Sequence, residues 1–125
     1  MFLGFESLTL FSEDPTKLAE FYREKVGLKQ TLEAEMGEKN EPLFGFEDVK
    51  LYVVHHSEVH GQNKEPERII FNLEVDEIEP EIERLDKVGI KKVGTLHHIE
   101  GYGKIQTYED IDGNYFQLVQ VREPS

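Results

Sequence analysis

The sequence predicts an α+β domain over residues 1–125, built from two βαβββ modules. The first supporting observation is internal similarity, because Glu24–Lys29 (EKVGLK) closely matches Asp86–Lys91 (DKVGIK), 62 residues further along the chain. Asp14 and Asp76 are separated by the same 62 residues. The second observation is that strand-like and helix-like patterns follow in the same order on both sides of a polar stretch. A repeat of this length that occurs only twice does not fit a solenoid and indicates a duplicated unit.

The two modules cover about residues 1–56 and 68–122, and a polar segment with Gly and Pro at 57–67 is predicted to form the linker. Each module opens with a strand, and three more strands follow its helix. The predicted strands lie at 5–11, 28–32, 43–46, 50–56, 68–75, 90–96, 104–109 and 114–121. Alternation in the first strand places Ser7 and Thr9 on one face. Four phenylalanines are expected mostly in the core, with one or two lining a cleft: Phe2, Phe5, Phe44 and Phe46.

Each predicted helix has a recognisable start, an apolar face and an end. Asp14 can cap the first helix, Pro15 fits its first position, and Gly27 suits a left-handed C-terminal stop. The second helix has Pro80 in its first turn and ends at Gly89. The apolar faces consist of Leu18, Phe21, Tyr22 and Val26 in the first helix, and of Ile78, Ile82, Leu85 and Val88 in the second.

Composition excludes several classes of function. The net charge of −12 disfavours binding to nucleic acid and to anionic membranes, and it would favour a cationic ligand if it gathered near a cleft. The absence of cysteine excludes disulfides, thiolate metal sites and cysteine nucleophiles. No apolar run approaches the roughly 18 residues of a membrane span, and the first residues lack the features of a signal peptide. We therefore expect a cytoplasmic globular protein.

A turn followed by a strand near the C-terminus carries a family resemblance. The residues Asp110–Asn114 (DIDGN), with Gln117-Leu118 shortly after them, resemble the Asp-Pro-Asp-Gly-Asn and Glu-Leu signature of the vicinal oxygen chelate superfamily. This superfamily includes glyoxalase I, bleomycin resistance proteins and extradiol dioxygenases. Further similar features are the helix start at Asp14-Pro15 with Phe21-Tyr22, the Val26-Gly27-Leu28 junction, Val75-Asp76, and Tyr102-Gly103. The resemblance implies that the two sheets curl together into an open barrel around a cleft.

Metalloenzymes of this superfamily hold a divalent ion through His and carboxylate side chains that point into the cleft. The resemblance places the corresponding positions at Ser7, near Tyr52, at Ile70 and at Gln117. None of these is a His or a carboxylate, and the amide of Gln117 is a neutral, weak donor. We therefore predict no metal site and no cofactor at these positions.

The candidate cleft residues follow from these positions and from the alternation of the strands that carry them. Tyr102 is included because its loop lies over the cleft in the resembling proteins, where an aromatic between two glycines could serve as a lid or simply pack. The predicted ligand-binding cleft contains Ser7, Thr9, Tyr52, Val54, His56, Ile70, Asn72, Glu74, Tyr102 and Gln117.

The five histidines leave an alternative open. The simpler interpretation places them at strand ends and in loops, exposed to solvent. The alternative is a displaced metal site that uses His56 and Glu74, with His97 or His98 as a further ligand.

Two functional hypotheses result. The first is a small-molecule binding protein without the usual metal ligands, similar to the bleomycin resistance branch and sequestering a cationic or aromatic compound. The alternative is a divergent glyoxalase- or dioxygenase-type metalloenzyme with an unconventional divalent-metal site, so catalytic activity and catalytic residues stay open. A regulatory or interaction role is a third possibility. The resemblance also implies a homodimer.

Overall fold

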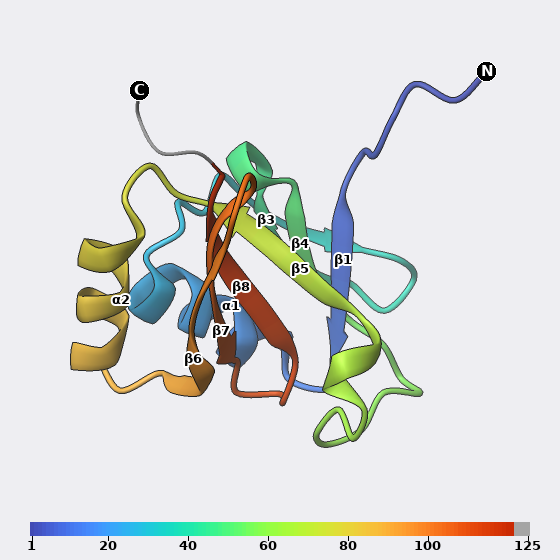
Figure 1. The fold of residues 1–125 in the computed structure, drawn as a ribbon. Coiled ribbons are helices and arrows are strands. Elements are labelled where there is room, and N and C mark those ends of the chain that lie inside the picture. The colour runs from blue at the N-terminus through green and yellow to red at the C-terminus, as the bar shows by residue number, and fades with distance from the viewer. Residues whose placement is uncertain (122–125) are drawn as a thin grey trace. The chain divides into compact units, whose positions relative to one another are not determined.

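The structure is a computed structural model that describes residues 1–121, and the chain forms two compact units that divide between Gly61 and Gln62. Each unit contains one four-stranded sheet and one helical segment (Figure 1). The strand order is β1-β4-β3-β2 in the first sheet, here called sheet A, and β5-β8-β7-β6 in the second, sheet B. In both sheets the first strand pairs in parallel with the last, and the remaining pairs are antiparallel. The predicted α+β fold of two βαβββ modules is confirmed.

The bounds of the elements are as follows. The first unit contains β1 (Leu8–Ser12), α1 (Pro15–Glu20), the π-helical turn η1 (Phe21–Val26), β2 (Leu32–Met36), β3 (Glu41–Phe46), the 3-10 turn η2 (Glu47–Val49) and β4 (Leu51–His55). The second unit contains the 3-10 turn η3 (Pro66–Arg68), β5 (Ile70–Glu74), α2 (Ile78–Lys87), β6 (Lys91–Ile99), β7 (Gly103–Glu109) and β8 (Tyr115–Gln120).

The first helix is built as the sequence predicts. The Asp14 carboxylate accepts a hydrogen bond from the Lys17 amide at 3.2 Å, and Pro15 is the first helical residue. The helical segment ends at Gly27, whose φ of 89° is left-handed. The four predicted apolar residues of this helix are all buried, and the buried Phe44, Phe46, Leu51 and Val53 share one face of sheet A. The helix therefore covers one face of sheet A and leaves the other face without a helix of its own unit.

Two predictions in the first module were wrong. The strand expected at 28–32 lies at Leu32–Met36, because this edge strand alternates Leu, Ala and Met with Glu and lacks a continuous apolar run. Phe2 and Phe5 are 102% and 75% exposed instead of buried, although Phe44 and Phe46 do belong to the core. Pairing of the first strand begins only at the Leu8 amide, which bonds to the Lys50 carbonyl, so the residues before it have no strand partner in sheet A.

The second helix is anchored by residues that the sequence analysis did not single out. Ile78 and Leu85 are fully buried as predicted, whereas Val88 is 43% exposed. The amide of Ile78 bonds to the side-chain oxygen of Gln120 at 2.9 Å, so a buried strand residue caps the helix. The Asp76 carboxylate, which corresponds to the capping Asp14, bonds instead to the adjacent amide of Glu77.

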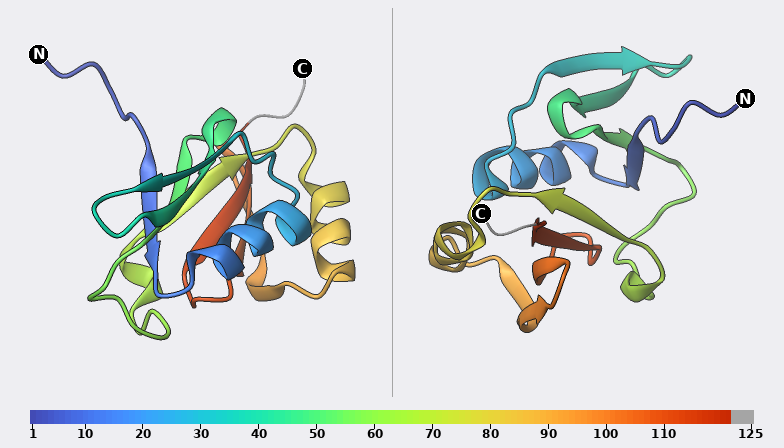
Figure 2. Two further views of the ribbon diagram at one scale, coloured as in Figure 1. Left: turned by 180° about the vertical axis from the view of Figure 1, so that it is seen from behind. Right: turned by 45° about the horizontal axis from the view of Figure 1, so that its top comes forward.

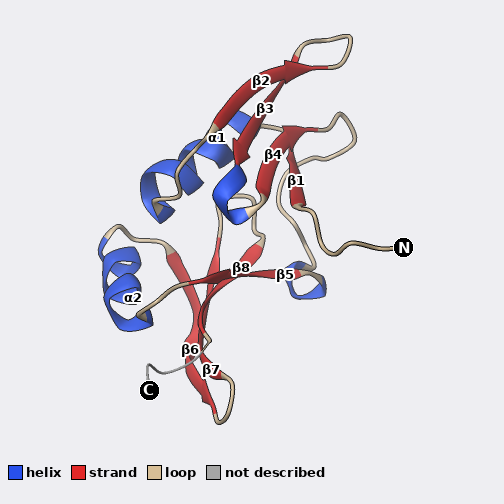
Figure 3. Cartoon of the chain, turned by 90° about the horizontal axis from the view of Figure 1, so that it is seen from above, coloured by secondary structure: helices blue, strands red, loops and turns tan. Residues whose placement is uncertain are grey.

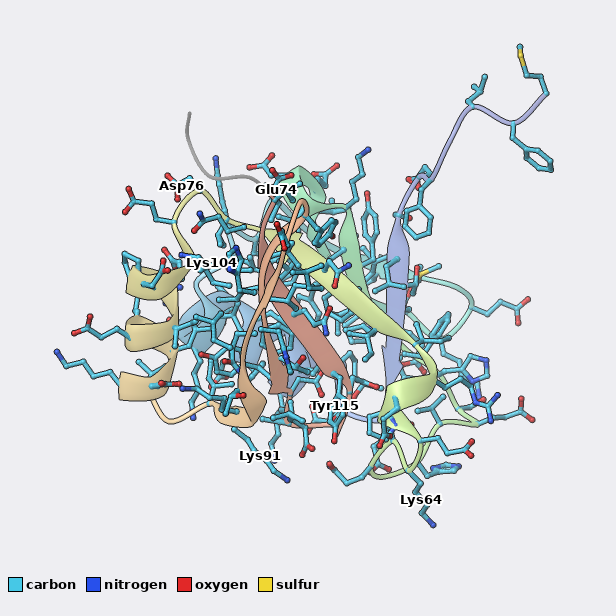
Figure 4. The ribbon with its side chains drawn as sticks, in the orientation of Figure 1. Lys64, Glu74, Asp76, Lys91, Lys104 and Tyr115 are labelled. Carbon is cyan, nitrogen blue, oxygen red and sulfur yellow. The ribbon has the colours of Figure 1, made fainter. Side chains whose placement is uncertain are left out.

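A hydrogen-bonded network fastens this helix to sheet B. The buried Tyr108 hydroxyl lies 3.2 Å from the Asp86 carboxylate, whose other oxygen is 2.6 Å from the Lys92 ammonium. On the surface, Lys104 donates to Glu79 at 2.6 Å, and this hydrogen bond lowers the pKa of the Glu79 carboxyl (Figure 4 labels Lys104). The contacts join α2 to β6 and β7.

The Tyr108 network makes stability depend on alkaline pH. Burial, with the nearby Asp86 carboxylate, raises the pKa of the Tyr108 phenol well above its ordinary value of about 10. Because the folded pKa is the higher one, the stabilising contribution is complete below about pH 10 and is lost as the pH rises through the folded value. Urea unfolding at several pH values should show stability falling less steeply above pH 10 in Tyr108→Phe than in the wild type. Parallel curves for the two proteins would contradict this assignment.

The segment between the units is held at both ends. The Gly61 amide bonds to the Glu13 carboxylate at 3.0 Å, within the first unit. In the second unit, the Gln62 side chain donates to the Ile111 carbonyl at 2.7 Å, and the Asn63 amide donates to the Asp112 carbonyl at 2.7 Å. We call Gln62 and Asn63 the linker clasp. The predicted strand start at residue 68 is two residues too early, since Pro66–Arg68 forms a turn and β5 begins at Ile70.

The clasp explains the glycine in the DIDGN turn. Gly113 has a left-handed φ of 83°, and a Cβ there would lie 3.0 Å from the Gln62 side-chain oxygen and 3.2 Å from the Asn63 carbonyl. Both the backbone conformation and the close approach of the clasp therefore require glycine.

Within residues 1–121, neither helix is long and apolar enough to cross a membrane.

Candidate functional site

The helix-free face of sheet A is mainly apolar and aromatic. Cross-strand pairing places Thr9 beside Tyr52 and Phe11 beside Val54, so these four residues share one face. Sheet A continues this face with residues on its other two strands, which are Leu43 and Gly45 on β3 and Leu32, Ala34 and Met36 on β2. Ser7 lies one residue before β1 and is half-buried. The structure therefore places Thr9, Tyr52 and Val54 on one face of sheet A together with Phe11, and their part in ligand binding stays a prediction.

Close packing holds the Tyr52 ring on this face, and a ring contact joins Phe11 to His56. A Cβ on Gly45 would lie 3.1 Å from the Tyr52 ring and 3.0 Å from the Leu32 Cβ, so the ring lies directly against the glycine. The Phe11 and His56 rings meet edge to face, with centroids 5.1 Å apart. The His56 Nδ1 accepts a hydrogen bond from the Glu58 amide at 3.1 Å, which orients the ring. Tyr52, Phe11 and His56 thus offer aromatic surface held in place by the backbone.

The helix-free face of sheet B is more polar. Pairing places Asn72 beside Gln117, and Gln117 beside Thr107. The Gln117 amide nitrogen donates to the Thr107 hydroxyl at 2.9 Å. By alternation, the same face carries Ile70, Glu74, Tyr115, Val119, Ile105 and Glu109. The Glu74 and Tyr115 positions on β5 and β8 are labelled in Figure 4.

The two carboxylates on this face differ in their surroundings. Glu109 lies 3.5 Å from the Lys91 ammonium, which offsets its charge. Glu74 is exposed at the end of β5 and forms no ion pair with another residue of the range 1–121. Glu74 therefore supplies the negative charge of this face that a cationic ligand group could approach.

The residues at the implied metal positions do not fit a divalent ion. They provide a hydroxyl at Ser7, a phenol at Tyr52, an aliphatic side chain at Ile70 and a neutral amide at Gln117, whose nitrogen is already engaged by Thr107. Such ions are held by imidazole and carboxylate groups. In the described part of the chain, no three His, Asp or Glu side chains are grouped closely enough to hold a metal ion.

The histidines lie at strand ends, in a loop and on an edge strand. His55 lies 3.1 Å from the Glu41 carboxylate, and His60 lies 3.8 Å from that of Glu13. His97 and His98 are consecutive exposed residues of β6 and therefore point to opposite faces of sheet B. His56 and Glu74 belong to different units, so the displaced metal site stays a prediction.

Tyr102 lies in the turn between β6 and β7, which form a long hairpin (Figure 3). Its side chain is 42% exposed, and its amide bonds to the Ile99 carbonyl at 3.0 Å. The hairpin contains a bulge, because pairing shifts between Val93 and His97. Buried Gln106 donates to the carbonyls of Val93 and Gly94 in this bulge, at 3.4 and 3.3 Å. A role for Tyr102 as a lid stays a prediction.

Sequence reasoning missed several residues of these faces, among them Phe11, Thr107 and Tyr115. Phe11 could have been found by extending the alternation of Ser7 and Thr9 by one step. Thr107 and Tyr115 could not, because their places depend on the register of β7 and β8.

The repeated βαβββ units, each with a helix-free face lined by aromatic or polar side chains, define a protein of the glyoxalase-like class. A family model described as a glyoxalase-like domain matches residues 7–119, so the chain belongs to that family. The resemblance to the vicinal oxygen chelate superfamily is confirmed. No curated protein matches the chain.

Several solved structures share the fold along nearly the whole chain. A glyoxylase/bleomycin resistance protein/dioxygenase domain from a Frankia species has a TM-score of 0.75 at 15% identity, covering 98% of this chain and 100% of that one. FosX, a fosfomycin resistance protein from Listeria monocytogenes, has a TM-score of 0.69 at 15% identity, with coverages of 98% and 96%. TnmS3, an antibiotic binding protein from a Streptomyces species, has a TM-score of 0.69 at 17% identity, with coverages of 97% and 98%. At these identities the likeness concerns the fold.

Proposed function

We propose that this member of the glyoxalase-like family is a small-molecule binding protein that works without the metal site of the superfamily's enzymes. The observation that carries the proposal is the chemistry of the four implied ligand positions. Ser7, Tyr52, Ile70 and Gln117 offer no imidazole and no carboxylate, while the same sheet faces offer aromatic and hydrogen-bonding groups. Each face by itself suits recognition of a whole molecule better than activation of one bond.

The chemistry of the two faces indicates the kind of ligand. Tyr52 and Phe11 on sheet A can stack against an aromatic ring. Gln117 and Asn72 on sheet B can exchange hydrogen bonds with amide or hydroxyl groups, and Glu74 can attract a cation. We therefore propose a cationic or aromatic compound as the ligand, because the face of sheet A suits an aromatic ring and the face of sheet B suits a cationic or hydrogen-bonding group. The antibiotic binding by TnmS3, a protein of the same fold, supports the choice of antibiotic-like compounds for a first screen.

The proposal includes two features of the protein in the cell. The first is a cytoplasmic location. The second is assembly into a homodimer, which light scattering would reveal.

The ligand proposal is tested with bleomycin as the first probe, followed by a panel of cationic aromatic compounds. Isothermal titration in the presence of EDTA should detect binding to the wild type. Tyr52→Ala and Phe11→Ala should each weaken binding by about fivefold, since an aromatic contact contributes about 1 kcal/mol. Val88→Ala is the matched control and should bind like the wild type, because it removes an exposed apolar side chain that directly follows α2.

Metal content separates this proposal from the enzyme alternative. Protein exposed to Zn, Ni, Mn and Fe(II) and then desalted should retain far less than one ion per chain. Retention of one ion per chain, lost in His56→Ala or Glu74→Ala, would replace the proposal by the displaced metal site. Absence of binding by every member of the panel would also contradict it.

A further inference from the structure

The segment Met1–Phe5 is the most exposed apolar stretch of the described chain. Its four large side chains are Met1, Phe2, Leu3 and Phe5, with exposed fractions of 111%, 102%, 93% and 75%. Apolar side chains that are exposed singly are ordinary on a protein surface, but four of five consecutive residues form a continuous apolar stretch. Figure 2 shows the segment as an extended trace that leaves the start of β1.

The segment differs in charge from the rest of the chain. Residues 1–5 contain no charged side chain, in a chain that is 32% charged with a net charge of −12. Two copies of such an acidic chain repel each other over most of their surfaces. Contact between copies is therefore least opposed where an apolar segment without acidic side chains forms the interface.

The backbone of the segment is also suited to an added contact. Residues 1–7 lie outside the strands, and backbone pairing of β1 begins at Leu8. β1 is an edge strand of sheet A, so the segment continues a sheet edge. Extended chain with unpaired backbone groups and apolar side chains is the form in which peptides add to another protein surface.

From these features we infer that the segment Met1–Phe5 docks onto a second copy of this chain and holds the proposed homodimer together. Burying four large apolar side chains removes on the order of 600 Å² from solvent, with a similar area covered on the partner. One such docking reaches only the low end of specific interfaces. Reciprocal docking in a two-fold dimer doubles the area and reaches the range of stable homodimers.

The inference rests on the proposed homodimer and is tested by light scattering with a matched pair of variants. The wild type should scatter as twice the 14.5 kDa mass of one chain. The triple variant Phe2→Ser, Leu3→Ser and Phe5→Ser should scatter as a monomer, with the dimer dissociation constant raised roughly a hundredfold or more. The control variant Ile69→Ser, Val88→Ser and Ile111→Ser removes three other exposed apolar side chains and should stay dimeric.

The outcomes separate the segment's role from the dimer itself. A monomeric wild type would overturn both proposals. A dimeric triple variant would overturn the role of the segment and leave the dimer standing. Because the substituted side chains are exposed, circular dichroism should show the triple variant to be folded, and its affinity for bleomycin is measured separately.

Cross-linking provides a second readout that does not depend on how a substitution changes the stability of the dimer. The chain has no cysteine, so Leu3→Cys carries a single thiol that can be labelled with a benzophenone maleimide. Irradiation should give a cross-linked species of two chains, which Ile69→Cys labelled in the same way should not give. Cross-links confined to a single chain would contradict docking onto a second copy.

Discussion

Replacing Gly103 by alanine is expected to lower the free energy of unfolding by about 3 kcal/mol or more. Gly103 opens β7 with a φ of 152°, a conformation that L side chains rarely adopt. An added Cβ would collide with the carbonyl oxygen of Gln120 and would lie 3.1 Å from the Cα of Val121. These are backbone atoms of the neighbouring strand, so no side-chain rotation can relieve the collision. Urea unfolding of the variant and the wild type measures the effect.

Gly101→Ala is the matched control for this prediction. Gly101 lies in the same hairpin turn with a left-handed φ of 81°, but no atom lies within 4 Å of its added Cβ. It should therefore show only the backbone cost of about 1 kcal/mol. Equal destabilisation of the two variants would show that the collision of the added Cβ at Gly103 costs nothing beyond the backbone conformation.

Replacing Asp110 by alanine should have the second largest effect, a loss of about 3 kcal/mol. The Asp110 carboxylate is buried and accepts hydrogen bonds at 2.9 Å from the amides of Asp112 and Asn114, and at 3.1 Å from the Asn114 side chain. Hydrogen bonds to a charged group are the stronger kind, and their removal leaves donors without a partner in the turn. Thermal unfolding of the variant measures the loss.

The effect of Asp110→Ala should extend to the candidate site, because this turn leads directly into β8 and Gln117. Asp76→Ala is the control, since the exposed Asp76 carboxylate accepts a hydrogen bond from the adjacent Glu77 amide, and it should change stability by less than about 0.5 kcal/mol. A loss below about 1 kcal/mol for Asp110→Ala would contradict the importance of the buried carboxylate.

Much of the fold follows from local sequence signals. The junction repeat, the cap at Asp14 and the stop at Gly27 depend on a few neighbouring residues, and the structure has them as predicted. The strand Leu32–Met36 was misplaced because its pattern is that of a charged sheet edge. Phe2 and Phe5 were assigned to the core because composition alone does not show where strand pairing begins.

The candidate site was predictable as far as alternation reaches. Thr9 with Tyr52, and Asn72 with Gln117, share faces of their sheets as the period of two requires. The hydrogen bond from Gln117 to Thr107, the packing of Tyr52 on Gly45 and the helix cap by Gln120 join residues distant in sequence. Such contacts depend on strand register, which a single sequence specifies only weakly.

The linker clasp has a consequence for how the chain can be cut or extended. Gly61 is hydrogen-bonded to the first unit, and Gln62 and Asn63 are hydrogen-bonded to the second. Only the peptide bond between Gly61 and Gln62 therefore lies between the hydrogen bonds to the first unit and those to the second. The segment without strands that contains this bond is much longer. An insertion after Gly61 keeps both sets of hydrogen bonds, whereas an insertion between Gln62 and Asn63 separates the two halves of the clasp. The bond after Gly61 is thus the natural site for a fusion partner, a protease site or separate expression of the two halves.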